Sequence, residues 1–460
     1  MAHWKRKKAS IVIGFLCAVA FLLVGQVQAS QEGTATILVR IQPNIQLSDG
    51  SLQDAVGRWT KQTQMLAPMR TLGSHTPIES RRGALRSVYT LTVERSKLRE
   101  TLALLKADPA VMYAEENVPV HAFFTPNDPE YGLQWHLPKI GVDSAWDKAD
   151  TPPFGGASSV VVAVIDTGVA YENSSNRGKT FAQAPDFAST PFVAGYDFVN
   201  DSAHANDDNG HGTHVASTIA ENTNNNSAGA GIAFSTSIMP IKVLDATGSG
   251  TVADVALGLT FATQNGAEVI NLSLGANYAS QTLQEAVNAA ISAGIIIVAA
   301  AGNEGATALS LPAGYPGVLS VSALGKTDAI ASYSNTGTGL ALSAPGGDGT
   351  DYVMQQTFSN LDSENLPLDY TTFGMVGYQG TSQAAPQVAA AAALLLAKSV
   401  PASSIISLLE NSATDLGPSG YDTTYGYGRL NIGAAFIAYL NDTTPPVTSI
   451  SISPETPNGA

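Results

Sequence analysis

The sequence has almost no cysteine: Cys17 is the only one among its 460 residues. A single cysteine excludes an internal disulfide, and no later part of the chain has a thiol for catalysis. Charged residues are also few, at 13%, whereas hydrophobic residues make up 44%. This balance predicts a globular protein rather than a disordered or fibrous one. A chain of this length exceeds what one hydrophobic core usually organises, so two folded units are expected.

Basic residues become scarce after about the first quarter of the chain. Residues 30–124 hold 11 basic and 9 acidic side chains, a net charge of +2. From residue 125 onward there are 8 basic and 29 acidic side chains, a net charge of −21. A surface this acidic argues against nucleic acid and anionic lipid as partners. It favours solubility and the binding of cations.

The apolar stretch Ile11–Val24 is short for a membrane span. It follows the basic cluster Lys5–Lys8 and precedes small residues at Val27–Ala29. This is the pattern of a secretory signal peptide over residues 1–29. We therefore expect a secreted, extracellular protein with no membrane anchor once that segment is removed.

Residues 30–124 have the pattern of a small α/β unit. The expected strands are Thr34–Ile41, Ser87–Val93 and Val111–Val120, and the expected helices are Leu52–Met65 and Ser96–Ala107. Residues 123–129 follow neither pattern and contain two prolines. They are expected to form an exposed linker that is open to proteolytic processing.

From residue 135 to about residue 440, short apolar runs alternate with helical patterns. The runs are Val160–Ile165, Ile238–Val243, Val269–Leu274, Ile295–Ala299 and Val318–Val321, and the helical segments include Val252–Gln264 and Leu283–Ala293. Strands that are apolar on both faces and alternate with helices predict a parallel sheet covered on both sides. Active sites in such sheets gather at the carboxyl ends of the strands. Residues 442–460, rich in Thr, Pro and Ser, are expected to be a tail.

Four short segments place chemically useful side chains beside these strands and helices. Asp166 follows a buried strand in Val-Ile-Asp-Thr-Gly, and His211 lies between glycines in Asn-Gly-His-Gly-Thr-His. Asn303, in Ala-Gly-Asn-Glu-Gly, follows another strand, where its amide can donate to an oxyanion. Ser382, in Gly-Thr-Ser-Gln-Ala-Ala-Pro, falls in the first turn of an expected helix, where free backbone N–H groups favour negative charge. Taken singly, the aspartate and asparagine also fit turns, and the serine fits a helix cap.

The four segments together, in the chain order Asp, His, Asn, Ser, resemble the subtilisin family over residues 135–440. The resemblance implies a subtilisin-like three-layer α/β/α fold with a mainly parallel sheet. It implies a serine endopeptidase that hydrolyses internal peptide bonds of proteins through an acyl-enzyme, without a catalytic cofactor. Ser382 would then be the nucleophile, His211 the general base and Asp166 its orienter. Asn303 would donate to the oxyanion.

The resemblance also implies residues that hold substrate and metal. Two edge segments, between which these proteases hold a peptide as an added strand, correspond to Gly248, Ser249 and Gly250 and to Ser273, Leu274 and Gly275. A structural calcium site of relatives corresponds to Asp128, Asp186, Asn225 and Ser227. Carboxylate, amide and backbone oxygens are the ligands that calcium prefers.

Residues 30–124 are similar to the propeptide of the family, a small ferredoxin-like α/β unit that acts as an intramolecular inhibitor until it is cleaved. The expected order is a signal peptide at 1–29, a propeptide at 30–124, a catalytic domain at 125–441 and a tail at 442–460. We expect a self-processing zymogen that works as a monomer on protein substrates.

Two other functions stay open at this point. His204, His211 and His214 stand near two aspartates, so a metallohydrolase built on this cluster is one alternative, although the spacing is not H-E-x-x-H. The other alternative is a secreted binding module that keeps the fold without catalysis.

Overall fold

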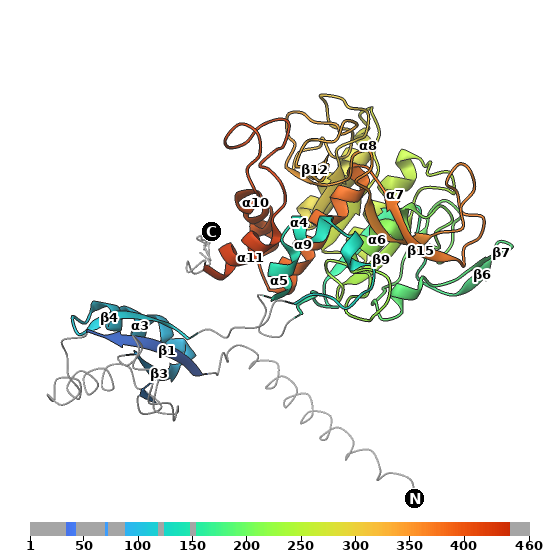
Figure 1. The fold of residues 1–460 in the computed structure, drawn as a ribbon. Coiled ribbons are helices and arrows are strands. Elements are labelled where there is room, and N and C mark those ends of the chain that lie inside the picture. The colour runs from blue at the N-terminus through green and yellow to red at the C-terminus, as the bar shows by residue number, and fades with distance from the viewer. Residues whose placement is uncertain (1–33, 43–69, 72–87, 118–123, 148–152, 442–460) are drawn as a thin grey trace, which may run out of the picture. The chain divides into compact units, whose positions relative to one another are not determined.

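In this computed structural model the described residues are 34–42, 70–71, 88–117, 124–147 and 153–441 (Figure 1). The chain divides into two compact units, residues 1–121 and 122–460. The expected signal peptide, the expected helix Leu52–Met65 and the expected tail lie outside the described residues. No helix in the described ranges is long and apolar enough to cross a membrane.

The N-terminal unit contains one antiparallel sheet and one well-described helix. Its strands, in the spatial order β2-β3-β1-β4, are β1 (Thr34–Ile41), β2 (Arg70–Thr71), β3 (Val88–Glu94) and β4 (Val111–Glu116). The short turn η1 (Arg95–Lys97) leads into helix α3 (Leu98–Ala107). Alternate residues of β1, such as Ile37 and Val39, are buried and share a hydrophobic cluster with Leu105 of α3. The three strands expected from the sequence are present, within the described part of the unit.

The larger unit is built on a seven-stranded sheet with the order β13-β12-β11-β10-β5-β9-β8. Its strands are β5 (Val161–Asp166), β8 (Tyr196–Asp197), β9 (Ser237–Lys242), β10 (Val269–Leu272), β11 (Ile296–Ala300), β12 (Leu319–Leu324) and β13 (Leu342–Pro345). Neighbouring strands pair in parallel throughout this sheet. All five expected apolar runs are strands of it, whereas the edge strands β8 and β13 are additional.

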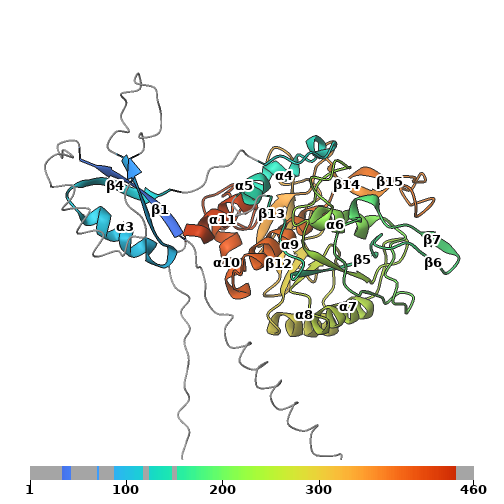
Figure 2. The same ribbon diagram turned by 90° about the horizontal axis from the view of Figure 1, so that it is seen from below.

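Helices cover both faces of this sheet, as Figure 2 shows. Helices α7 (Val252–Gln264) and α8 (Gln281–Ser292) lie on one face, and α6 (His211–Ala220) and α9 (Thr381–Ala397) lie on the other. Side chains of β5 point alternately to the two faces of the sheet. Val162 and Val164 belong to the hydrophobic cluster that contains α9, whereas Ala163 and Ile165 belong to the cluster that contains α7 and α8. The expected three-layer α/β/α architecture is confirmed.

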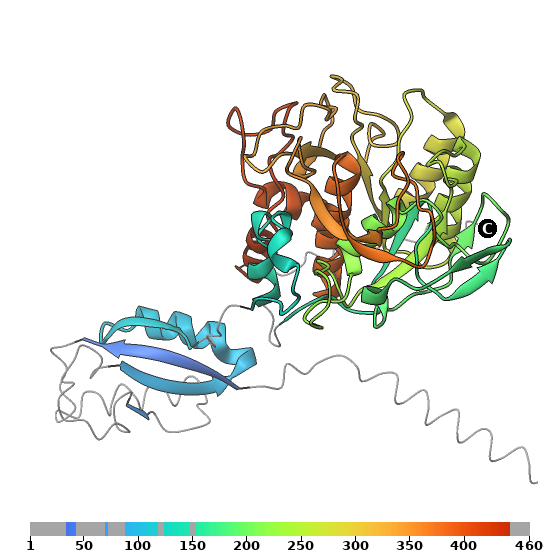
Figure 3. The same ribbon diagram turned by 45° about the vertical axis from the view of Figure 1, so that its right-hand side comes forward.

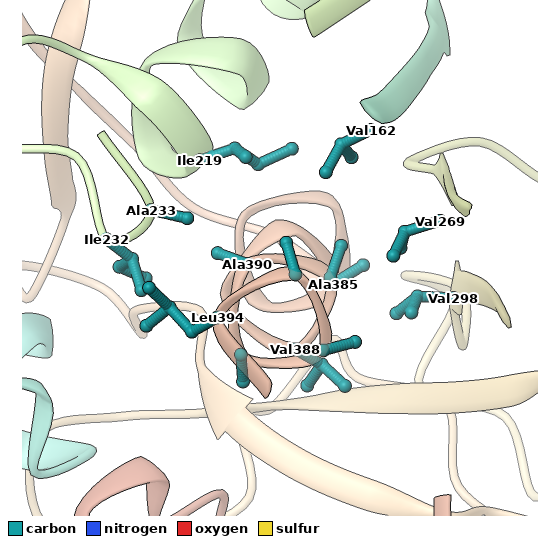
Figure 4. Close-up of a cluster of buried hydrophobic side chains, with 14 of the residues drawn as sticks. Val162, Ile219, Ile232, Ala233, Val269, Val298, Ala385, Val388, Ala390 and Leu394 are labelled. Atoms are coloured by element: carbon teal, nitrogen blue, oxygen red, sulfur yellow. The ribbon is translucent and has the colours of Figure 1, made fainter. Parts of the chain in front are cut away.

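Helix α9 runs through the centre of its layer and is buried on all sides (Figure 4). Val162, Val269 and Val298 of the sheet approach it from one direction, and Ile219 of α6 approaches from another. The alanines at positions 389–393 are all fully buried. Small side chains let the strands and α6 come close to this helix, which accounts for the alanine-rich sequence.

The remaining elements surround these layers. They are η2 (Tyr131–Leu133), α4 (His136–Lys139), α5 (Val142–Asp147), β6 (Ser174–Asn176), β7 (Lys179–Phe181), η3 (Pro185–Phe187), α10 (Ala402–Ser412) and α11 (Ile432–Asn441). Strands β6 and β7 form a small antiparallel hairpin of their own.

The segment 353–378 forms a second antiparallel hairpin, β14 (Val353–Phe358) and β15 (Phe373–Tyr378), which packs on α6 (Figure 3). Ser217 Oγ on α6 donates a hydrogen bond to the carbonyl of Gln356 at 2.9 Å. Thr357 Oγ1 donates to the carbonyl of Gly210 at 2.6 Å, immediately before α6 begins. The hairpin therefore holds the start of α6 in place.

Candidate active site

An aspartate and a histidine meet at the carboxyl edge of the large sheet. Asp166 is the last residue of β5 and is fully buried, and His211 is the first residue of α6. Nδ1 of His211 lies 2.8 Å from Oδ1 of Asp166. The backbone N–H of Thr167 donates to the same oxygen at 2.7 Å. Asp166 was expected just after its strand, whereas β5 includes it as the last residue.

This contact sets the proton affinity of the imidazole. Burial alone would lower the pKa of His211, but the charge and the hydrogen bond of Asp166, together with the charge of Asp207, outweigh burial and leave the pKa raised. The side chain of His211 keeps 25% of its surface exposed. A histidine in this state can accept a proton from a group in the cleft while Asp166 stabilises the imidazolium that results.

Asp207 is buried, and from the sequence it was considered only as one of the two aspartates near the histidines of the metallohydrolase alternative. Its Oδ1 accepts from Thr167 Oγ1 at 2.9 Å, from Asn209 N at 2.9 Å and from Gly210 N at 3.0 Å. Its Oδ2 accepts from the backbone N–H and the hydroxyl of Thr213, at 2.9 and 2.6 Å. These donors belong to the end of β5 and to the start of α6. Asp207 therefore fixes the element that carries His211 against the element that carries Asp166.

A fully buried lysine lies beside this network. Lys242, the last residue of β9, donates to the carbonyls of Thr167 and Leu244 at 2.7 and 2.6 Å and to Oδ1 of Asp208 at 2.7 Å. Oδ2 of Asp208 pairs with Lys179 at 2.9 Å. The sequence did contain a signal for this network, a lysine inside the otherwise apolar run 238–243. A buried ammonium group requires polar partners, so such a lysine indicates acidic or carbonyl groups nearby.

Ser382 is the second residue of α9 and is only partly buried. Its hydroxyl donates to the carbonyl of Ser273 at 3.0 Å, and the hydroxyl of Ser273 donates back to the carbonyl of Ser382 at 2.8 Å. That carbonyl is free to accept because the helix places Pro386, which has no N–H, four residues further on. The hydroxyl of Ser382 is thus engaged with Ser273, and among the described residues no hydrogen bond joins it to His211.

Two hydrogen-bond donors face the space above Gly380. Oδ1 of Asn303 accepts from both the N–H and the hydroxyl of Thr381 at 2.9 Å, which leaves Nδ2 free to donate elsewhere. A Cβ on Gly380 would lie 3.5 Å from Asn303 Nδ2 and 3.6 Å from the backbone nitrogen of Ser382. The φ of Gly380 is +150°, which also favours glycine. The side-chain oxygen of Gln383 lies 2.9 Å from the same point. Asn303 Nδ2 and the N–H of Ser382 are the two groups near this point that can donate to an oxyanion.

The two predicted edge segments face each other across a cleft of about 650 Å³. The cleft is lined by His211 and Thr167, by residues 247–252 and by residues 273–276. Residues 248–250 and 273–275, predicted from the resemblance, thus lie in one cavity with the imidazole. Tyr278 and Leu311 also line it and were not singled out. Neither residue lies in a glycine-marked motif, so no sequence signal identified them.

The three histidines of the metallohydrolase alternative face three different partners. His204 Nδ1 contacts Glu172 Oε1 at 2.8 Å, whereas His211 contacts Asp166. His214 donates from Nε2 to two backbone carbonyls of the β14–β15 hairpin and stacks on Tyr378, with ring centroids 4.5 Å apart. Burial, aided by the charge of His211, lowers the pKa of His214 to about 3. Because the imidazoles do not converge, this alternative is wrong.

The residues predicted to hold calcium do come together. Asp128 accepts at its two oxygens from the N–H groups of Asn224 and Asn225, at 2.7 and 2.9 Å. The side chain of Asn225 donates to Oδ1 of Asp186 at 2.5 Å, and its own oxygen accepts from the N–H of Ser227 at 3.0 Å. Oδ2 of Asp186 is buried without a hydrogen-bond partner. A buried, unpartnered carboxylate oxygen is what a cation site requires.

Glu221 is a further acidic residue at this place that the sequence analysis missed. It follows α6, is fully buried, and has no hydrogen-bond partner at either carboxylate oxygen. Burial and the charge of Asp186 raise the pKa of Glu221 well above its usual range, and burial raises the pKa of Asp186 to about 6. Among the described residues no three His, Cys, Asp or Glu side chains are grouped to hold a metal alone. Carbonyl and amide oxygens of the loop 222–229 would have to complete a calcium site.

The fold and this geometry are those of a hydrolase that uses a serine nucleophile on a doubly covered parallel sheet. Residues 157–428 match the Subtilase family, Peptidase S8. The chain belongs to the subtilase family, and it is a subtilisin-like serine endopeptidase. Enzymes of this family need no catalytic cofactor. The resemblance drawn from the sequence is confirmed, and a binding module without catalysis is set aside.

Individual relatives support this assignment. The chain is 38% identical over 339 residues to the thermophilic serine proteinase of Bacillus sp. (strain AK1), covering 73% of this chain and 76% of that protein. It is 36% identical over 309 residues to thermitase of Thermoactinomyces vulgaris, covering 67% of this chain and 98% of thermitase. Among solved structures, a protease of Pseudoalteromonas arctica PAMC 21717 is similar, with a TM-score of 0.58 and 30% identity over 68% of this chain and 99% of that one.

Proposed function

We propose that Ser382, His211 and Asp166 form the catalytic triad of this endopeptidase and that Asn303 donates to the oxyanion. The observation that carries the proposal is the 2.8 Å contact between His211 and Asp166 at the carboxyl edge of the sheet. His211 lines the same cavity as Ser273, and Ser382 is hydrogen-bonded to Ser273. Each role follows from the atom that the residue presents.

The reaction has two halves, acylation of the serine and hydrolysis of the acyl-enzyme, and His211 transfers one proton in each. Ser382 Oγ attacks the carbonyl carbon of the peptide bond and its proton passes to Nε2 of His211, while Asp166 stays ionised and holds Nδ1. The oxyanion accepts hydrogen bonds from Asn303 Nδ2 and from the N–H of Ser382. His211 then protonates the leaving amine, the C–N bond breaks, and an acyl-enzyme remains. A water molecule, deprotonated by the same imidazole, hydrolyses the acyl-enzyme.

The substrates are protein chains held in extended form. Residues 248–250 and 273–275 both line the cleft. A peptide that enters between them can pair with backbone groups, largely independently of its own side chains. Such binding suits an enzyme that cuts at internal positions of many proteins.

Variants of the two proposed roles separate nucleophile from oxyanion donor. Ser382→Ala should abolish hydrolysis of casein. Asn303→Ala should lower kcat by roughly 10²–10³-fold with little change in KM, because the amide acts on charge that is present only in the transition state. Asn265→Ala, an exposed asparagine after α7, is the matched control and should leave both constants unchanged. An unaltered kcat in Asn303→Ala would remove that residue from the oxyanion role.

The enzyme is made as a secreted, self-processing zymogen. This part of the proposal is supported by the separate N-terminal α/β unit, by the processing linker expected at residues 123–129 and by the signal-like residues 1–29. Ser382→Ala should accumulate as uncut precursor in a host without extracellular proteases, and added active enzyme should then cut it. Normal maturation of this variant in such a host would show that another protease makes the cut. After processing, the catalytic unit works as a monomer.

A structural calcium ion belongs to the proposal as well. Asp128, Asp186, Asn225 and Ser227 would hold it, and the unpartnered buried oxygens of Asp186 and Glu221 support its presence there. The ion would supply positive charge among carboxylates that otherwise lie close together, and it would take no part in the reaction.

A further inference from the structure

A second cavity lies on the catalytic unit outside the cleft. It measures about 480 Å³ and is bounded by residues 313–319 and 339–341 and by side chains from α10 and from the loop after it. These two segments lead into β12 and β13, so the cavity lies at the amino ends of those strands. Asp166 and Asn303 lie at the carboxyl ends of β5 and β11. The cavity is therefore at the opposite edge of the sheet from the proposed catalytic residues.

Two tyrosine rings form an exposed wall of this cavity. Tyr421 and Tyr427 are 45% and 40% exposed, and their ring centroids are 5.2 Å apart at an interplanar angle of 59°. The hydroxyl of Tyr421 accepts a hydrogen bond from the N–H of Gly339 at 3.0 Å, which fixes that ring to the rim. Exposed aromatic faces attract cations, and a planar guanidinium group can stack on them.

Glu410 of α10 is the one charged residue among those that line the cavity. Burial is the cause that raises the pKa of its carboxyl, and no cationic neighbour counteracts it. A carboxylate that has lost part of its water without gaining a partner is stabilised when a cation arrives. A guanidinium group can donate two parallel hydrogen bonds to such a carboxylate.

We propose that this cavity binds the guanidinium group of an arginine side chain presented by another protein. Glu410 pairs with the cation, and one of the two tyrosine rings stacks on its plane while the other, tilted by 59°, meets its edge. The aliphatic stem packs on Ile406 and Leu340. The net charge of −21 from residue 125 onward attracts basic proteins to this unit. The site goes beyond the proposed function, because it would hold a basic protein at the edge of the molecule that is remote from the cleft.

The test uses full-length Ser382→Ala protein, which cannot hydrolyse the probe. The probe is N-acetyl-L-arginine methylamide, which represents an arginine within a chain, and its Kd is measured by saturation-transfer NMR. Glu410→Gln should weaken binding roughly three- to tenfold, the effect of a charge-assisted hydrogen bond reduced by partial exposure. Tyr427→Ala should weaken it by a similar factor. Glu364→Gln, an exposed glutamate elsewhere, should leave the Kd unchanged, and N-acetyl-L-norleucine methylamide should not bind measurably.

Several outcomes would overturn the proposal. Equal Kd values for Glu410→Gln and Glu364→Gln would remove the carboxylate from the site. Glu304 lines a separate, smaller cavity together with Asn277 and Asn335. Loss of binding in Glu304→Gln, with normal binding in Glu410→Gln, would place the probe in that cavity instead. Tighter binding of free L-arginine than of the blocked probe would identify a free amino acid as the ligand rather than a protein. The control is the melting temperature of each variant. A value within about two degrees of the parent protein shows that weaker binding results from a change in the cavity and not from unfolding.

Discussion

Single buried carboxylates decide how the proposed catalytic residues are held. Asp166 contacts the imidazole directly, but Asp207 connects the two elements that bring Asp166 and His211 together. A carboxylate can accept several N–H and O–H donors at once, which an amide of the same size cannot do. The position of His211 therefore depends on a residue that touches neither the substrate nor the reacting serine.

Asp207→Asn should shift the acidic limb of the kcat/KM profile to lower pH. The general base must be unprotonated, so activity is lost as the pH falls through the pKa of His211. The charges of Asp166 and Asp207 raise that pKa, so removing the charge of Asp207 should lower it. kcat should also fall, by about tenfold, because the amide cannot accept every donor and the imidazole is displaced.

The pH profile of hydrolysis of a short peptide substrate measures both effects. His214, whose pKa is lowered to about 3, is neutral over this pH range, so Asp166 and Asp207 are the charges that act on the imidazole of His211. Glu285→Gln, which removes an exposed carboxylate from α8, is the control and should leave the limb in place. A profile for Asp207→Asn that overlays that of the parent enzyme would contradict the role given to Asp207.

At the scale of elements, two hairpins support each other beside the start of α6. Tyr370, in the connection between β14 and β15, stacks on Phe181 of β7 with ring centroids 5.1 Å apart. Its carbonyl accepts from the N–H of Ala182 at 3.0 Å, and Lys179 lies 4.8 Å from the centre of its ring. Lys179 in turn pairs with Asp208. The connection between β14 and β15 therefore stabilises the β6–β7 hairpin in addition to joining its own two strands.

Replacing residues 359–372 with Asn-Gly should lower the melting temperature while leaving the chemistry intact. An aromatic pair contributes about 0.5–1.5 kcal/mol beyond its buried area, and in a domain of this size that corresponds to a fall of roughly one to three degrees. kcat/KM for a short peptide should stay within about twofold. Tyr370→Ala isolates the ring contact and should account for much of the decrease, whereas Tyr370→Phe should keep it. An unchanged melting temperature in the shortened protein would show that the connection does not brace its neighbour.

The sheet was predictable because each of its long strands carries its own signal. Runs such as 160–165 and 269–274 are apolar on both faces, so burial is visible without knowledge of the neighbours. The edge strands β8 and β13 are short and were not found. The proposed catalytic residues were found because glycines mark them. Asp207, Lys242 and Glu221 were not, because a buried charge is explained only by partners that the fold supplies.

At the scale of the whole catalytic unit, calcium should raise the melting temperature. A cation that binds only the folded state stabilises it by about 2.7 kcal/mol when its concentration is one hundred times the Kd. We therefore expect a rise of roughly five degrees on adding calcium after chelator treatment, measured by calorimetry. Asp186→Asn should remove most of this gain, and Glu285→Gln should keep it. A melting temperature that is independent of calcium and chelator would show that the proposed site does not bind the ion.

The burial of α9 determines how the enzyme loses activity. This helix carries Ser382 at its first turn, and its alanines at positions 389–393 have no surface in contact with water. Backbone amides in such an element exchange with solvent only when the entire domain opens, whereas frayed elements exchange by local opening. The proposed nucleophile therefore belongs to the last part of the unit to open. Heating should leave the fraction of active molecules equal to the fraction still folded, with no population of folded molecules that has lost its active site.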